Sequence, residues 1–328
     1  MKKAVAPLIL VTIVLLALGV IADAQQAGKA ARIGYLDSGT AAGSAELLDA
    51  FRKRMTQFNW IEGKNLTIEY HYADSNLDRL SELAIELVSL KMDVMVLNNT
   101  TTALAVKKAT STIPIVMVSS TNPVENGLIA SLAHPGGNVT GHTGFAEELS
   151  GKRLETLKET IPKLTRVGVI TGLGLGSDTQ LEAMKEAASA LGLKLVKIGS
   201  ASDHEKLLSA FQFAVRERVH GITTISGPAV FTQRKGIILL AANYKLPAMY
   251  PQKEFAEEGG LMSYGNDFRE NYRLAAVYVD KILRGAKPGD LPVERPTKFE
   301  FIINLKAAKQ IGLTIPPNVL ARADKVIK

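Results

Sequence analysis

The sequence predicts an α/β protein with two doubly wound, Rossmann-like lobes of parallel sheet joined by a hinge, and three observations lead to this prediction. The chain has 328 residues, of which 46% are hydrophobic, so it is longer than one average domain and can bury two cores. From Arg32 onward, short apolar strands alternate with amphipathic helices, which is the pattern of right-handed βαβ units. After about five strands the alternation breaks near 140–148 and then resumes, which indicates a hinge.

The first half of the chain contains strand-length apolar runs separated by helical periodicity. Apolar residues three or four positions apart between 47 and 58 predict a helix with one buried face. Ser75 and Asp78 have the spacing of a capping box that starts the next helix. We expect a further short helix over 123–137, which Pro135 and the following glycines would end. The expected strands are 32–36, 66–73, 94–98 and 113–120.

The second half repeats this alternation. Ser177 with Gln180, and Ser202 with Glu205, again have capping-box spacing. Helices are expected to begin near Ser177, Ser202, Pro228 and Gln252, and a long helix is expected over 267–283. The expected strands are 166–171, 193–200, 221–227, 247–251 and 261–265.

The first 24 residues have the organisation of a secretory signal peptide. Lys2 and Lys3 precede an apolar run over 4–22, and small residues stand at Ala22 and Ala24, as signal peptidase requires. We therefore expect cleavage after Ala24 and a periplasmic protein. An uncleaved membrane anchor is the alternative, because the apolar run is nearly long enough to span a bilayer.

Charge and cysteine content exclude several classes of protein. The net charge is +7, and the basic residues are spread along the chain, whereas a nucleic-acid-binding surface would gather them with aromatic neighbours. The chain has no cysteine, so it forms no disulfide and lacks the lipid-accepting residue of a lipoprotein. Its five histidines are scattered, and we expect no metal site.

Ligands of open α/β proteins bind beyond the carboxyl ends of the strands. The loops at those positions are rich in Ser, Thr, Asn and Gly, which offer neutral hydrogen-bond donors and free N–H groups suited to a carboxylate. The same residue types are also plain N-caps and turn formers. The expected ligand contacts are Ser38, Gly39, Asn99, Thr100, Thr101, Ser120, Thr121, Gly174 and Gly227, together with the aromatic residues Phe145, Tyr250 and Tyr264.

The glycine-rich loop 172–176 differs from nucleotide-binding motifs. It has the pattern G-x-G-x-G before Ser177, whereas the dinucleotide motif needs G-x-G-x-x-G and an acidic residue about 20 positions later. Val196 and Lys197 occupy that later position. The chain also has no G-x-S-x-G motif. We therefore expect no cofactor and no catalytic residue, and interpret the loop as part of a cleft. Trp60 is expected to be a packing residue.

Four segments carry a resemblance to a known family. They are GKNLTIEYHYA (63–73), the long segment 111–141 that ends in LAHPGGNVTG, ELSGKRLETLKE (148–159) and GGLMSYGND (259–267). These resemble the substrate-binding proteins of ABC transporters of the tryptophan/tyrosine-binding type, which have the type I periplasmic-binding-protein fold. The resemblance spans about 32–317 and implies three crossovers between the lobes, near 141–147, 265–267 and 297–304. It implies an N-terminal lobe of 31–143 plus about 266–297 and a C-terminal lobe of 144–265 plus about 298–328.

This resemblance implies a periplasmic solute-binding protein of an ABC importer. Such a protein closes on a small ligand, here expected to be aromatic or carboxylate-bearing and amino-acid-like, and passes it to a membrane permease with a cytoplasmic ATPase. We expect a monomer that binds no nucleic acid. An exported sensor that passes a closed-lobe signal to a receptor is the alternative, and an enzyme on the same scaffold is a third hypothesis.

Overall fold

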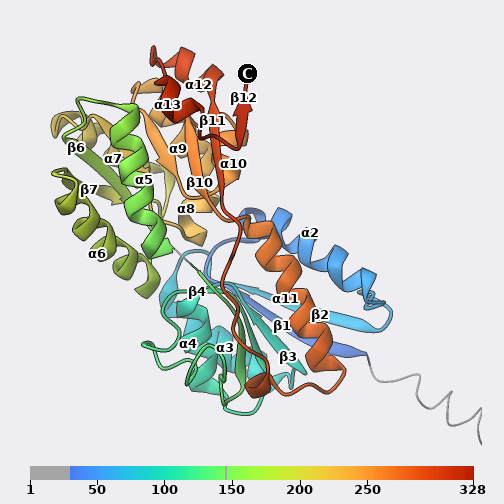
Figure 1. Cartoon of the computed structure of the whole chain (residues 1–328). Coiled ribbons are helices and arrows are strands. Elements are labelled where there is room, and N and C mark those ends of the chain that lie inside the picture. The colour runs from blue at the N-terminus through green and yellow to red at the C-terminus, as the bar shows by residue number, and fades with distance from the viewer. Residues whose placement is uncertain (1–29, 145) are drawn as a thin grey trace, which may run out of the picture.

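The computed structural model describes residues 30–144 and 146–328, and for 146–148 it describes the backbone only. Its two lobes lie one above the other, each built on its own sheet (Figure 1). The expected signal peptide, with its cleavage site after Ala24, and the expected ligand contact Phe145 lie outside the described residues.

The first lobe contains a five-stranded sheet in the order β2-β1-β3-β4-β5, and every pair in it is parallel. Helices α3 and α4 cover one face, and α2 and α11 cover the other (Figure 1). The strands are β1 (Ala31–Asp37), β2 (Leu66–Tyr72), β3 (Val94–Leu97), β4 (Ile115–Ser120) and β5 (Val139–Thr143), and the helices are α2 (Ala41–Gln57), α3 (Leu80–Ser89), α4 (Thr100–Ala109) and α11 (Phe268–Leu283).

The second lobe contains a seven-stranded sheet in the order β12-β11-β10-β9-β8-β6-β7. The pair β10–β11 is antiparallel and the other pairs are parallel. Its strands are β6 (Arg166–Thr171), β7 (Lys194–Ser200), β8 (Gly221–Thr224), β9 (Ala248–Tyr250), β10 (Met262–Gly265), β11 (Glu300–Asn304) and β12 (Lys325–Ile327). Its helices are α5 (Ala146–Thr160), α6 (Leu175–Ala190), α7 (His204–Arg216), α8 (Pro228–Thr232), α9 (Arg234–Asn243), α10 (Lys253–Glu257), α12 (Leu305–Gln310) and α13 (Pro317–Leu320).

The first sheet has hydrophobic cores on both faces, which explains its continuous apolar strands. Successive side chains of a strand point to opposite faces. Accordingly, Ile33 and Tyr35 of β1 pack into one core, and Leu36 packs into the other. Parallel strands buried on both faces are typical of doubly wound folds, so the alternation in the sequence correctly indicated the fold class.

Three chain segments pass between the sheets. The first runs from β5 to α5, and the second runs from β10 to α11, which packs against α2 and the first sheet. The third leaves Glu294, which pairs with His142 of β5, and reaches β11 in the second sheet. Its path between the lobes is visible in Figure 1. Helix α11 therefore packs on the first sheet.

The helix expected over 123–137 is absent from the described chain. These residues form turns, and the backbone at Asn122 and Gly127 has positive φ angles of 45° and 68°. Leu128 and Ile129 both donate their N–H groups to the carbonyl of Pro123, and both side chains enter the core. Turns thus bury apolar residues within the segment where a helix was expected. The next segment forms β5, which crosses the position of the expected break.

The three expected capping boxes are also wrong. Asn76 accepts from the N–H of Asp78 and caps a short 3-10 helix (η1, Leu77–Arg79), while Asp203 caps α7 by accepting from Lys206. Each of these residues follows the serine that was expected to cap, and Asn and Asp cap at least as well as Ser. Helix α6 starts at Leu175 with Gly174 at its N-cap, so Ser177 lies inside the helix.

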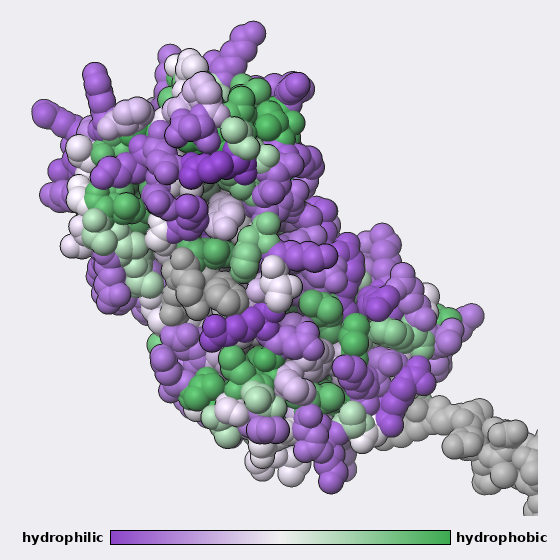
Figure 2. Space-filling view, in the orientation of Figure 1, coloured by the Kyte–Doolittle hydropathy of each residue, from purple (hydrophilic) through white to green (hydrophobic). Residues whose placement is uncertain are grey.

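Hydrophilic residues cover most of the face shown in Figure 2, on both lobes, and hydrophobic residues lie there in separate groups. Within 30–144 and 146–328, no helix has the length and hydropathy needed to cross a bilayer. Trp60 packs against the hydrophobic core, as expected, and its indole nitrogen donates to Asp280 of α11 over 2.8 Å.

Candidate ligand-binding site

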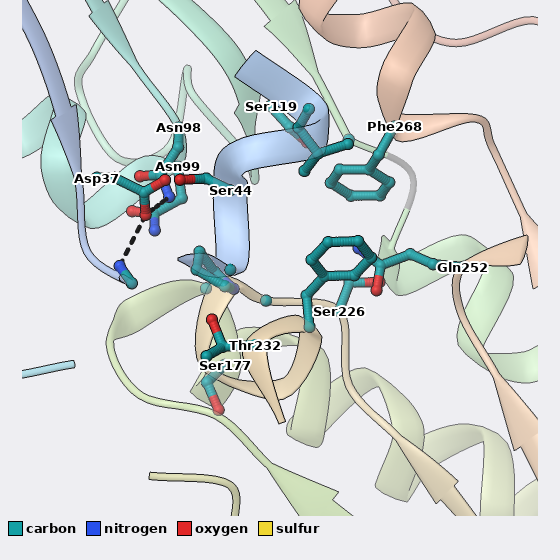
Figure 3. Close-up of a pocket in the computed structure, with 18 of the residues that line it drawn as sticks. Asp37, Ser44, Asn98, Asn99, Ser119, Ser177, Ser226, Thr232, Gln252 and Phe268 are labelled. Carbon is teal, nitrogen blue, oxygen red and sulfur yellow. Dashed lines mark hydrogen bonds between the residues drawn. The ribbon is translucent and has the colours of Figure 1, made fainter. Parts of the chain in front are cut away.

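A cavity lies between the two lobes, where the carboxyl ends of strands from both sheets face each other. The space inside the cavity and at its open mouth together amounts to about 950 Å³. The first lobe contributes the ends of β1, β3 and β4, and the second contributes the ends of β6, β8 and β9. Figure 3 shows these groups around the cavity.

The lobes touch on both sides of this cavity. Helix α2 lies against α8, and α4 lies against α6. Glycines permit both contacts: a β-carbon on Gly43 would overlap Thr232 Oγ1, and one on Gly174 would lie 2.5 Å from Thr101 Oγ1. The structure therefore represents a closed arrangement in which the facing backbones approach closely.

Asp37, at the end of β1, carries a buried carboxylate on the first-lobe side of the cavity. Its oxygens accept hydrogen bonds from Tyr35 Oη over 2.6 Å, from the Gly39 N–H over 2.7 Å and from Asn98 Nδ2. Burial raises the pKa of Asp37, and the bonds from Tyr35 and Gly39 oppose that rise. The carboxylate is thus fixed in position by neutral donors.

The neighbouring loops of the first lobe are joined to one another by side-chain hydrogen bonds. Asn99 caps α4, and its Nδ2 donates to Ser38 Oγ over 2.7 Å. Thr100 Oγ1 accepts from the Thr121 N–H over 2.8 Å and lies 3.2 Å from Ser120 Oγ. These bonds hold three strand-end loops in one arrangement, so the donors facing the cavity are pre-organised.

On the second-lobe side, Gln180 joins two loops. Its Nε2 donates to the carbonyls of Gly176 and Ser226 over 3.0 Å each, and its Oε1 accepts from the Ser226 N–H over 2.8 Å. The glycine-rich loop after β6 is therefore tied to the loop after β8. This corrects the expectation that Gln180 belongs to a capping box.

Arg153 of α5 brings a buried positive charge to the same cavity. Its Nε donates to the carbonyl of Tyr264 over 2.7 Å, while Nη1 has no hydrogen-bond partner among the described residues. Burial lowers the pKa of Arg153 to about 9. A buried guanidinium without an acidic partner is costly, so this side chain can accept an anionic group of a ligand.

Apolar groups complete the cavity. Phe231 and Phe268 approach it from α8 and α11, and Leu47, Leu173 and Pro228 also line it. The site thus combines flat hydrophobic surfaces with a few fixed polar groups, as small-molecule sites commonly do.

Among the described residues, no group of three or more His, Cys, Asp or Glu could hold a metal ion.

The sequence model for the family described as ABC transporter substrate binding protein matches residues 43–327. The chain belongs to this family. A tyrosine-binding protein of Clostridioides difficile is 28% identical over 267 residues, which is 80% of this chain and 75% of that protein.

Two solved structures have the same fold. A conserved domain protein of Vibrio cholerae is 31% identical, with a TM-score of 0.82 over 91% of this chain and 100% of its own. An ABC domain from Streptococcus pneumoniae, solved in complex with L-Trp, is 23% identical, with a TM-score of 0.80 over the same shares. The second similarity supports the fold alone.

The structure brings some expected ligand contacts of this substrate-binding protein to the cavity. Gly39, Asn99, Thr100, Thr101, Thr121 and Gly227 line it. Ser38, Ser120 and Gly174 lie directly behind them: Ser38 bonds to Asn99, Ser120 bonds to Thr100, and Gly174 faces Thr101. Contact of any of these with a ligand stays a prediction.

The two described aromatic residues among the expected contacts lie elsewhere. Tyr250 is fully buried and stacks on Phe255 with ring centroids 4.6 Å apart. Tyr264 packs edge-on against Phe301, and only its backbone carbonyl approaches the site, through Arg153. The side chains of both residues pack into the core of the second lobe. A position at the end of a strand therefore did not predict that the side chain faces the cavity.

The expected ligand contacts did not include Asp37, Arg153, Gln180, Phe231 and Phe268, all of which line the cavity. Asp37 directly follows the strand expected over 32–36, in a loop where the sequence predicts ligand contacts. Arg153 lies within a helix beside Lys152, and this local pattern is typical of a solvated surface.

Proposed function

We propose that this protein is the extracytoplasmic receptor of an ABC importer, which captures an amino-acid-like solute between its lobes and delivers it to a membrane permease. One observation carries the proposal: strand-end loops from both sheets surround a single cavity, and the lobes meet on both sides of it. Polar groups line the cavity from both lobes, so a ligand gains all its contacts only after closure. Such a ligand favours the closed form.

The comparisons support the ligand class. One relative is named for tyrosine, and one protein of the same fold was solved with L-Trp. The cavity here has fixed polar groups and phenyl rings, which suit an amino acid with an apolar or aromatic side chain. We infer binding without chemical conversion, because the polar groups already serve as hydrogen-bond partners that hold the loops.

We also propose the boundaries of the two lobes and the cellular location of the mature protein. The N-terminal lobe comprises 31–143 and about 266–297, and the C-terminal lobe comprises 144–265 and about 298–328. The membership of β1–β5 and β6–β12 in separate sheets supports this division, as does the packing of α11 on α2. We propose a periplasmic monomer released by cleavage after Ala24, on the basis of the N-terminal sequence pattern.

The direct test is to purify the mature protein, denature it mildly and identify the released molecule by mass spectrometry. That molecule should be small, should rebind the refolded protein without being altered and should compact it in small-angle X-ray scattering. A micromolar affinity corresponds to about −8 kcal/mol, which several satisfied hydrogen bonds and an apolar contact can supply. A protein that binds no small molecule, or that converts it, would contradict the proposal.

A further inference from the structure

We propose that an ion pair between the lobes, Arg269 with Glu254, controls closure: the lobes close fully only when Arg269 reaches Glu254 and neutralises its buried charge. Arg269 belongs to α11, which packs on the first sheet, and Glu254 belongs to α10, which packs on the second. Neither residue lines the cavity. The inference rests on the proposed function, because it concerns the closure that captures a ligand.

The chain segments that carry this pair lie side by side next to the cavity. A β-carbon on Gly265, where β10 ends, would overlap the carbonyl of Pro251, so the two backbones approach closely. Gln252, Asn266 and Phe268 of these segments line the cavity. A rotation of α11 relative to α10, as opening of the lobes requires, therefore takes place directly beside the ligand site.

Glu254 is a buried carboxylate with little compensation. It is 1% exposed, and neither of its carboxylate oxygens accepts a hydrogen bond from another described residue. The ion pair that it forms is with Arg269, whose Nε lies 3.5 Å from Oε1. Burial raises the pKa of Glu254, and the charge of Arg269 opposes that rise. Because an unpaired buried charge is strongly unfavourable, the ionised form of Glu254 depends on Arg269.

Arg269 faces carboxylates of both lobes. Its Nη2 donates to Glu46 of α2 in the first lobe, while its Nε faces Glu254 in the second. The side chain of Glu46 is about half exposed, so water can solvate its charge. Arg269 and Glu46 both belong to helices that pack on each other, and they stay together when the lobes separate. Only the contact with Glu254 then depends on closure.

The other charged side chains around Glu254 are paired with one another. Lys253 Nζ lies 2.7 Å from Asp267 Oδ2, and these two charges shift the pKa of Glu254 in opposite directions. Asp267 also caps α11 by accepting from the Arg269 N–H over 2.9 Å. The remaining acidic residues of α10 and its C-terminal end pair within the second lobe, Glu257 with Lys325 and Glu258 with Arg234. Arg269 is therefore the cation that compensates Glu254.

This arrangement couples closure to the charge of Glu254. Without Arg269, closing the lobes has to bury an unpaired carboxylate or protonate it. The closed form holds this proton more tightly than an open, hydrated form does, so closure without Arg269 becomes less favourable as pH rises above the usual pKa of a glutamate, near 4.5. The pair thus makes the closed form require one position of α11.

The test is a double-mutant cycle on the mature protein, with L-tyrosine, L-tryptophan and L-leucine as probes in titration calorimetry at about pH 5 and about pH 8. Arg269→Gln should bind the probe at least about tenfold more weakly than the unmodified protein at the higher pH and should recover affinity at the lower pH. The double variant Glu254→Gln/Arg269→Gln should bind more tightly than Arg269→Gln at the higher pH, because the uncompensated charge is gone.

The matched control is the ion pair of Glu270 and Arg273, which lies within α11 and is largely exposed. Glu270→Gln and Arg273→Gln, singly and together, should bind like the unmodified protein at both pH values. Thermal unfolding of the ligand-free proteins checks that each variant folds. A pair that merely supports the fold would lower the unfolding temperature of Arg269→Gln without making its affinity depend on pH, and this result would overturn the inference.

Glu254→Gln keeps the inference testable if Arg269→Gln does not fold. This variant buries no charge in the closed form, so it should bind the probe at least as tightly as the unmodified protein, with an affinity that changes less between the two pH values. Weaker binding by Glu254→Gln would overturn the inference, as would a double variant that binds no more tightly than Arg269→Gln.

The outcomes separate this inference from the proposed function. If Arg269→Gln binds a probe as tightly as the unmodified protein does, the inference is wrong and the proposed function stands. If none of the three amino acids binds, the molecule released from the purified protein takes their place in the same titrations. If nothing is released either, the proposed function is wrong and the inference falls with it.

Discussion

Gly43 of the first lobe faces Thr232 of the second so closely that a β-carbon on Gly43 would overlap Thr232 Oγ1. Gly43 lies in the first turn of α2, and Thr232 is the last residue of α8. The contact exists only while the lobes are closed. It therefore offers a way to alter closure without touching the polar groups of the cavity.

We predict that Gly43→Ala weakens ligand binding at least about tenfold, because the lobes can no longer reach the closed, binding-competent form. Since alanine favours helix over glycine by about 0.5–1 kcal/mol, the ligand-free protein should not lose stability. Gly151→Ala in α5 is the matched control, because its β-carbon would meet only Ala187 at 3.5 Å. Calorimetry and thermal unfolding measure both effects. Equal affinities for the two variants would show that this contact does not limit closure.

We predict that Gln180→Ala lowers both stability and affinity. Gln180 makes three hydrogen bonds that join the loops after β6 and β8. Because its removal leaves the partly buried N–H and carbonyl groups of Ser226 without these partners, the free energy of unfolding should fall by about 0.5–1.5 kcal/mol. Urea denaturation measures that loss, and titration of the released ligand measures the affinity. The exposed Glu182→Ala on the same helix should change neither, and a Gln180 variant with unchanged stability would contradict the interpretation.

Thr100→Ala should weaken binding more than Ser120→Ala does. Thr100 lines the cavity and accepts from the Thr121 N–H, whereas Ser120 lies behind it and acts through Thr100. Thr100→Ala removes a group that lines the cavity and leaves the Thr121 N–H without its acceptor. Ser120→Ala removes only the hydrogen bond that positions Thr100. Both should fold, with losses of about 1–2 kcal/mol. Dissociation constants of the two variants, measured under conditions in which both are folded, test which substitution weakens binding more. A larger loss of affinity for Ser120→Ala would place Ser120 in contact with the ligand.

The stability of the ligand-free protein should fall as pH rises, because the folded state holds a proton on Asp37 more tightly than the unfolded chain does. Burial raises the pKa of Asp37 above its usual value near 3.8, so the folded protein binds more protons than the unfolded chain once pH exceeds that value. Free energies of unfolding, measured by urea denaturation from pH 4 upward, should show this fall for the unmodified protein and a flatter profile for Asp37→Asn. Identical pH profiles for the two proteins would contradict a raised pKa of Asp37.

The sequence predicts the fold correctly where the apolar pattern of a segment matches its burial in the structure. Apolar runs placed β1, β3 and β6 because these strands are buried on both faces. β5 was not predicted, since VTGHT has few apolar residues, and the chain from 123 to 137 follows turn geometry set by glycine and proline. The polar and glycine residues of the strand-end loops predicted part of the cavity lining. Arg153 could not be found in this way, because a cavity that faces the middle of a helix is set by packing between distant elements.

The most direct measurement is a crystal structure of the mature protein with the molecule it carries when purified. The account predicts density between the lobes, in contact with the β1 and β3 loops of one sheet and with Arg153 or the β8 loop of the other. A ligand bound outside this cavity, or bound to one lobe only, would contradict it.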